Sequence, residues 1–197
     1  RIKQLKEKLK KLDKQRGMQR RSRRRSNALS VSIVGYTNAG KSTLFNYLTH
    51  EKILAENKLF ATLDTTSRKL FLEEGHSVVM SDTVGFIKSL PTTLIEAFKS
   101  TLEEATDSDL LIHVVDISNT NKAEQIIQVD KILKEIKAHE IPQLLVLNQI
   151  DKIDIKSGYD RDEYGNINHI QLSAKTGNGI EFLKKAIVEF SQKHKNQ

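Results

Sequence analysis

Two patterns of apolar residues alternate along most of this chain. Short, nearly continuous apolar runs indicate buried strands, and longer segments with an apolar residue every three or four positions indicate helices packed on them. The runs lie at 29–34, 110–116 and 144–147, and the helical patterns at 43–48, 126–136 and 180–190. This alternation predicts an α/β fold with a mostly parallel sheet, helices on both faces and a ligand at the carboxyl ends of the strands.

The remaining stretches are shorter or more polar. Residues 69–73 and 77–81 predict a two-stranded hairpin, and residues 94–102 predict a further helix. The polar residues from 154 to 168 predict a surface loop. His113 interrupts an apolar run, so we expect a hydrogen-bonded histidine in the core.

The N-terminal part is basic and only partly amphipathic. Ile2, Leu5, Leu9 and Leu12 predict a helix with a narrow apolar stripe, which needs a surface to pack against. Residues 1 to 30 hold 13 Lys or Arg and two acidic residues, a net charge of +11, whereas the whole chain carries +7. The arginine-rich run after the stripe is either a contact for a polyanion such as ribosomal RNA or a solvated linker. We therefore divide the chain into a basic helical linker or tail (1–27) and a nucleotide-binding domain (28–197).

Composition limits the classes of protein. With 197 residues and 38% hydrophobic residues, the chain suffices for one domain and an appendage. It has no cysteine, which is compatible with the reducing cytoplasm, and no apolar run of the length that spans a bilayer. We expect a cytoplasmic monomer that needs no membrane. The chain begins at Arg1 and not at Met, so we also expect a natural N-terminal part to precede it.

Residues 35–42, GYTNAGKS, lie between the first predicted strand and the first predicted helix. This pattern and context predict a phosphate-binding loop, in which backbone N–H groups surround a polyphosphate and Lys41 lies against its β- and γ-phosphates. The positive end of the following helix adds to the attraction. Ser42 offers a hydroxyl to Mg²⁺.

A second motif, Asp82-Thr83-Val84-Gly85, ends another predicted strand. Its carboxylate would hold the hydration shell of Mg²⁺, and the Gly85 N–H would reach a γ-phosphate. Thr62, with Thr65 as the second candidate, would close on Mg²⁺ and the γ-phosphate in a nucleotide-dependent switch, unless these threonines only cap a turn. Phe86 stands where many GTPases carry the glutamine that orients water, so we expect slow intrinsic hydrolysis.

A third group of residues selects the base. Asn148 and Asp151 follow a buried strand, and Ser173-Ala174-Lys175 follow a later one. Asp151 can accept hydrogen bonds from N1 and N2 of guanine, which adenine does not offer, so the site should reject ATP. We expect Asn148 to brace the loops around the base and the Ala174 N–H to donate to guanine O6.

Taken together, GYTNAGKSTLFN, LFATLDTTSR, DTVGFI and SAKTG, preceded by a leucine-striped basic helix, closely resemble the HflX-type translational GTPases. The resemblance implies a P-loop NTPase G domain that hydrolyses GTP to GDP and phosphate. It also implies a nucleotide switch that binds the large ribosomal subunit and ribosomal RNA, and that splits or rescues stalled or idle ribosomes. The resemblance further implies a glycine-rich N-terminal domain, which we expect to be missing from the given sequence.

The resemblance also assigns individual residues. Gln149 replaces the lysine of the family pattern NKxD, so we expect weaker nucleotide binding with guanine preference retained. Asn38 resembles the asparagine that holds K⁺ against the phosphates in potassium-stimulated relatives. The catalytic contacts would be Lys41, Thr62 and Gly85, and the metal ligands Ser42, Thr62 and Asp82. The expected GTP/GDP contacts are Gly35, Tyr36, Thr37, Asn38, Ala39, Gly40, Lys41, Ser42, Thr43, Phe60, Thr62, Asp82, Gly85, Asn148, Gln149, Asp151, Ser173, Ala174 and Lys175.

Two other functions remain open on the sequence. The chain could be an RNA- or partner-binding module that holds guanine nucleotide as a structural ligand with negligible turnover, because Phe86 replaces the usual catalytic side chain. A P-loop kinase is disfavoured because Asn148, Asp151 and residues 173–175 specify a base and no acceptor-binding lid is visible. Ribosome-stimulated turnover would separate the GTPase from the binding module.

Overall fold

The computed structural model of the chain describes residues 29–49, 66–72, 75–83, 85 and 105–195. The basic N-terminal segment, the predicted switch residues of the stretch 50–65 and the helix predicted over 94–102 lie outside them. No helix within the described residues is both long and apolar enough to cross a membrane.

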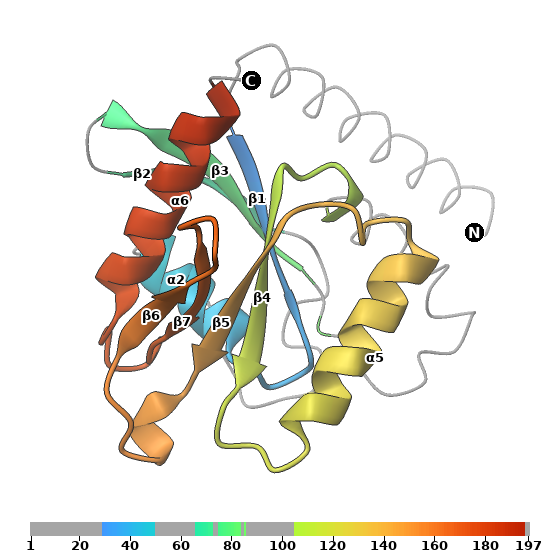
Figure 1. Cartoon of the computed structure of the whole chain (residues 1–197), viewed down its shortest axis with the longest axis vertical. Coiled ribbons are helices and arrows are strands. Elements are labelled where there is room, and N and C mark those ends of the chain that lie inside the picture. The colour runs from blue at the N-terminus through green and yellow to red at the C-terminus, as the bar shows by residue number, and fades with distance from the viewer. Residues whose placement is uncertain (1–28, 50–65, 73–74, 84, 86–104, 196–197) are drawn as a thin grey trace, which may run out of the picture.

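In the described part of the chain, seven strands form one sheet in the order β2-β3-β1-β4-β5-β7-β6 (Figure 1). Neighbouring strands are parallel except at the two edges, where β2 pairs antiparallel with β3 and β6 with β7. This confirms the mostly parallel sheet and the hairpin predicted near residues 69–81. The strands are β1 (Leu29–Gly35), β2 (Thr66–Phe71), β3 (Ser77–Asp82), β4 (Leu110–Asp116), β5 (Gln143–Asn148), β6 (Gly158–Arg161) and β7 (Ile167–Gln171).

Helices cover both faces of the sheet. Helices α2 (Lys41–Thr49) and α6 (Ile180–Lys195) lie on one face, and α5 (Lys122–Glu135) lies on the other (Figure 1). Strand β4 contributes Ile112 to the core under α2 and α6, and Leu111 to the core under α5. Because β4 is buried on both sides, its sequence is apolar almost throughout.

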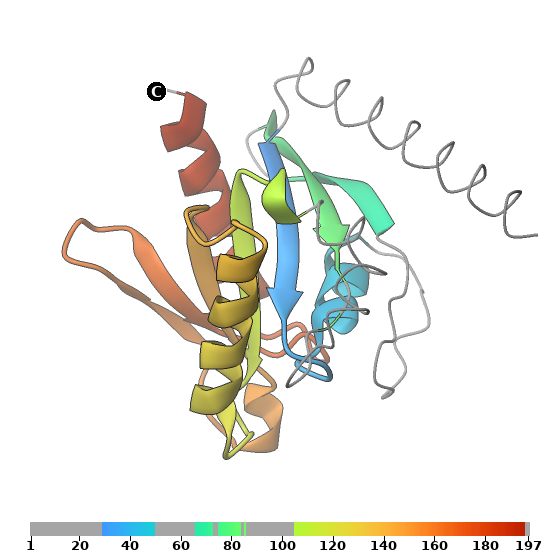
Figure 2. The ribbon, with the colours of Figure 1, turned by 90° about the vertical axis from the view of Figure 1, so that its right-hand side faces the viewer.

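The prediction of a surface loop over 154–168 is wrong, because β6 and the start of β7 form a hairpin there. The hairpin projects from one edge of the sheet (Figure 2). Tyr159 packs on Phe182 of α6 with 5.3 Å between ring centroids, and Arg161 pairs with Glu189 of α6. Both contacts attach this edge strand to α6, in addition to its pairing with β7.

His113 lies in the core as predicted, with 3% of its surface exposed. Its Nε2 atom is buried and has no hydrogen-bond partner, so the expected hydrogen bonding is wrong for this nitrogen. Burial, with a smaller effect of the Lys41 charge, lowers the pKa of His113 to about 4. The ring is therefore neutral at physiological pH.

Gly35, at the end of β1, touches the backbone of β4. Its φ is +147°, and a Cβ there would lie 2.3 Å from the Val114 carbonyl oxygen. We predict that Gly35→Ala lowers the free energy of unfolding by about 3 kcal/mol, because β1 must move away from β4. Gly158→Ala is the control, since a Cβ there meets nothing within 4 Å. Equal unfolding free energies of the two variants in chemical denaturation would contradict this contact.

Candidate nucleotide-binding site

The loop between β1 and α2 lies at the carboxyl edge of the sheet. Asn38 (φ +62°) and Gly40 (φ +93°) adopt left-handed backbone conformations there. Lys41 begins α2; its side chain is buried, and its Nζ donates to the Tyr36 carbonyl at 2.8 Å. Burial lowers the pKa of Lys41 to about 8, although the charge of Asp82 acts in the opposite direction. A buried ammonium in this setting is stabilised by an incoming anion.

The second motif meets this loop directly. Ser42 Oγ donates to Asp82 Oδ2 at 2.7 Å, so two of the three predicted metal-ligand residues lie together. A Cβ on Gly85 would lie 2.8 Å from Thr37 Cγ2 and 2.9 Å from Lys41 Nζ. The glycine backbone therefore lies against the phosphate-binding loop. The contact of its N–H with a γ-phosphate stays a prediction.

Thr83 also belongs to this arrangement, although the sequence reasoning assigned it no role. Its buried hydroxyl donates to the Ile33 carbonyl at 2.6 Å and so ties the end of β3 to β1. The available clue was a threonine directly after Asp82 at the end of a buried strand. This bond fixes the strand end that carries Asp82 beside the phosphate-binding loop.

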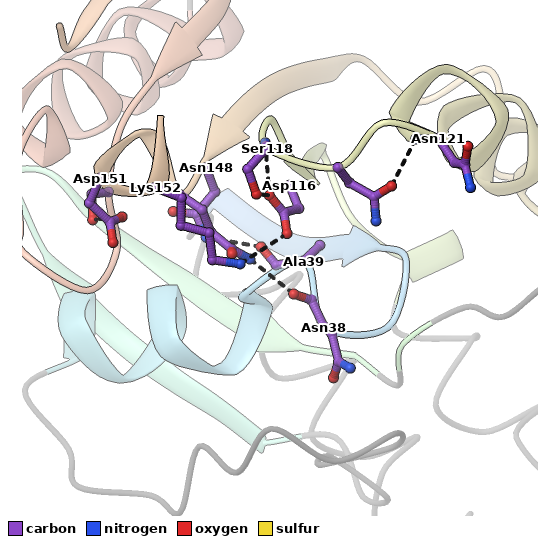
Figure 3. A network of polar contacts seen from close by, with 11 residues as sticks. Asn38, Ala39, Asp116, Ser118, Asn121, Asn148, Asp151 and Lys152 are labelled. Carbon is purple, nitrogen blue, oxygen red and sulfur yellow. Dashed lines mark hydrogen bonds and ion pairs between the residues drawn. The ribbon is translucent and has the colours of Figure 1, made fainter. Parts of the chain in front are cut away.

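Asn148, the last residue of β5, joins two loops (Figure 3). Its Nδ2 donates to the Ala39 carbonyl at 2.9 Å. Its Oδ1 accepts the Ala174 N–H at 2.9 Å. A Cβ on Gly40 would lie 2.3 Å from Asn148 Nδ2, so this glycine permits the approach. The amide holds the phosphate-binding loop and residues 173–175 together, which is the bracing that the sequence predicts.

Gln149 makes a second connection to the phosphate-binding loop. Its Nε2 donates to the Asn38 carbonyl at 3.0 Å, so the shorter, uncharged side chain still links the two loops. The Ala174 N–H, which we expected to donate to guanine O6, donates here to Asn148. A contact to O6 therefore requires this bond to shift or to be shared.

Asp151 is exposed and lies in a short turn, η2 (Ile150–Lys152), just after β5. Its Oδ1 accepts a 2.6 Å hydrogen bond from the buried Ser173 hydroxyl, so the two segments that the sequence predicts to select the base meet here. A cavity of about 540 Å³ opens beside them. Asp151, Asp154, Ser173 and Tyr47 are among its lining residues.

The other predicted residues differ in exposure or lie outside the described residues. Thr37 is buried, Thr43 is partly exposed on the first turn of α2, and Lys175 is exposed. Phe60, Thr62, Thr65 and Phe86 lie outside the described residues, so the predicted switch contacts stay predictions.

Asp116, at the carboxyl end of β4, is a further polar residue at this edge that the sequence reasoning did not assign (Figure 3). Its Oδ1 accepts bonds from the Ser118 N–H and hydroxyl, and its Oδ2 lies 3.4 Å from Lys152 Nζ. Its position at the end of an apolar run was the available clue. The contact connects β4 to the turn that carries Asp151.

Nucleotide affinity is expected to fall as the pH rises above about 8, the pKa of Lys41 in the free protein. Above that pH Lys41 is neutral, and a bound polyphosphate favours its charged form, so binding must take up a proton. The affinity for GDP should then fall by up to about tenfold per pH unit. The nearby His113 stays neutral across this range, because its pKa is about 4.

Calorimetric titration with GDP, in two buffers of different ionisation enthalpy, measures the affinity and the number of protons taken up on binding. Between about pH 7 and pH 9.5 we expect falling affinity accompanied by proton uptake. Constant affinity without proton uptake would contradict this assignment of the Lys41 ammonium.

Comparisons with known proteins show the family and the fold of this chain. Residues 30–149 match a family model described as "50S ribosome-binding GTPase". The chain is similar to GTPase HflX of Escherichia coli (strain K12), with 47% identity over 96% of this chain and 45% of that protein. It is also similar to GTPase HflX of Caldanaerobacter subterraneus subsp. tengcongensis, with 49% identity over 95% of this chain and 42% of that protein. The chain therefore spans less than half the length of these relatives.

A solved structure shows the same fold. It is a GTP-binding protein from the archaeon Sulfolobus solfataricus in complex with GDP. The TM-score is 0.65 with 30% sequence identity, over 84% of this chain and 53% of that one.

Proposed function

Because this chain belongs to the family of 50S ribosome-binding GTPases, we propose that it binds GTP with Mg²⁺, hydrolyses it to GDP and phosphate, and associates with the large ribosomal subunit as a nucleotide switch in the cytoplasm. The identities to two HflX proteins confirm the resemblance on which this proposal builds. They also confirm that the chain belongs to a family of GTPases. The structure has the expected fold of a P-loop G domain.

The two hydrogen bonds of the Asn148 side chain are the main support for this proposal. One side chain joins the loop that would hold phosphates to the loop that would hold the base. Asp151, oriented by Ser173, presents a carboxylate whose oxygens suit the N1 and N2 hydrogens of guanine. A nucleotide whose base meets Asp151 and whose phosphates meet Lys41 would contact both loops at once.

The donor set also fits Mg²⁺. Ser42 and Asp82 supply a hydroxyl and a carboxylate in contact with each other, and oxygen ligands are those that Mg²⁺ prefers. The ion, when bound, would neutralise charge on the β- and γ-phosphates. In this chain the Lys41 ammonium pairs with the charged phosphates, Gly85 donates its N–H to the γ-phosphate, and Asp151 selects the base.

GTP turnover in potassium buffer, with and without large ribosomal subunits, tests the proposal. We expect slow turnover by the chain alone and strong stimulation by the subunits, with the basic segment 1–27 contacting ribosomal RNA. Turnover that stays undetectable with subunits, while GTP still binds, would overturn the enzymatic part and favour a structural nucleotide.

Potassium is expected to stimulate this hydrolysis. Asn38 is exposed in the phosphate-binding loop, and its backbone is fixed by the bond that its carbonyl accepts from Gln149. We propose that its side chain helps to hold K⁺ against the phosphates, where a cation stabilises developing charge. The measurement is turnover in potassium and in sodium at equal ionic strength, with Asn38→Ala beside the wild type. Equal rates in the two salts would contradict a role for K⁺.

A further inference from the structure

Helix α2 contacts the turn that follows Ser173, and this contact is separate from the hydrogen bonds made by Asn148. The cavity of about 540 Å³ is lined by Tyr47 from α2 and by Thr176, Gly177 and Asn178, among other residues. A Cβ on Gly177 would lie 1.9 Å from Tyr47 Oη and 2.5 Å from its Cζ. Tyr47 therefore lies in direct contact with the turn at Gly177.

This turn is connected to the residue that selects the base. Gly177 has φ +85°, and its N–H donates to the Ser173 carbonyl at 2.9 Å. The Thr176 N–H donates to Ser173 Oγ at 3.2 Å, and that hydroxyl in turn donates to Asp151. A displacement at Gly177 would therefore pass through Ser173 to the Asp151 carboxylate.

We propose that Tyr47 is a positioning residue for guanine recognition, which holds the turn of residues 173–177 by packing on Gly177. The proposal rests on the guanine nucleotide proposed above. Tyr47 lies on the helix that begins with Lys41 and Ser42, so it connects the phosphate end of the site to the base end. It touches neither the base nor the phosphates in this role; it acts through Ser173 and Asp151.

Two glycine variants separate the Tyr47 contact from backbone strain. Gly177→Ala and Gly165→Ala place alanine at nearly equal left-handed φ values, +85° and +78°, but a Cβ at residue 165 meets nothing within 4 Å. We expect Gly177→Ala to weaken GDP binding about tenfold, and Gly165→Ala by less than about twofold. Adding Tyr47→Ala to Gly177→Ala should restore part of the lost affinity, because it removes the clash. Equal losses in the two glycine variants would overturn the proposal.

Substitution of Tyr47 itself tests the effect on base selection. IDP lacks the 2-amino group of GDP, so the ratio of the two affinities measures the contact that Asp151 makes. Tyr47→Ala should lower the preference for GDP over IDP by about fivefold, whereas Tyr47→Phe, which keeps the ring, should stay within about twofold of the wild type. An unchanged ratio in Tyr47→Ala would show a merely structural residue and overturn the proposal.

The two proposals fail in different ways. A wild-type chain that does not bind GDP would contradict the proposed nucleotide. The Tyr47–Gly177 contact is then still measured by the coupling of the two substitutions in the free energy of unfolding. If Gly177→Ala does not fold, the affinity ratio of Tyr47→Ala decides.

Discussion

Replacing Asp151 by asparagine is expected to weaken GDP binding by at least about 100-fold, and to make XDP a better ligand than GDP. The carboxylate only accepts hydrogen bonds, which suits the N1 and N2 hydrogens of guanine. Asparagine turns one acceptor into a donor that meets another donor on guanine, whereas xanthine offers an oxygen at that position. The Ser173 hydroxyl, now 2.6 Å from Oδ1, can still donate to the amide oxygen.

Competition against a fluorescent guanine nucleotide measures this change. Asp154→Asn is the matched control, because Asp154 lines the same cavity and the same change of charge is made. It should leave GDP affinity within about twofold of the wild type. If Asp151→Asn kept its GDP affinity and gained none for XDP, Asp151 would not be the base-selecting residue.

Replacing Lys41 by methionine is expected to weaken GDP and GTP binding by at least about 1,000-fold, because a buried ammonium that meets phosphate charge is lost. The same substitution should leave the nucleotide-free protein as stable as the wild type, or more stable. Burial lowers the pKa of Lys41 to about 8, so the free protein holds this charge at a cost in solvation that methionine avoids.

Titration calorimetry measures the nucleotide affinity, and chemical denaturation of the same preparation measures the free energy of unfolding. Loss of binding together with a large loss of stability would mean that Lys41 chiefly supports the loop, through the hydrogen bond that it donates to the Tyr36 carbonyl.

Much of this site could be predicted from the sequence because its residues follow apolar strands. The phosphate-binding loop comes directly after one, Asp82 and Asn148 are the last residues of two others, and the carboxyl ends of parallel strands meet at one edge of a sheet. The spacing of residues does not say which group bonds to which. The Ala174 N–H thus donates to Asn148, an acceptor that the pattern did not indicate.

Strand β6 and the contact at Tyr47 could not be predicted for different reasons. Strand β6 pairs with β7 alone and packs on α6 through Tyr159. Its sequence lacks the alternation of apolar and polar residues that would predict a strand. Tyr47 is one position in a helical pattern, and its contact depends on the left-handed turn at Gly177, far away in sequence. Long-range contacts of this kind leave no local pattern.

The most direct test of this account is the binding of GDP and ADP to the chain in the presence of Mg²⁺, compared by titration calorimetry under identical conditions. The contacts of Asp151, Ser173 and Asn148 predict that GDP binds and that ADP binds at least about 1,000-fold more weakly. Comparable affinities for the two nucleotides would contradict a guanine-specific site at the carboxyl edge of this sheet.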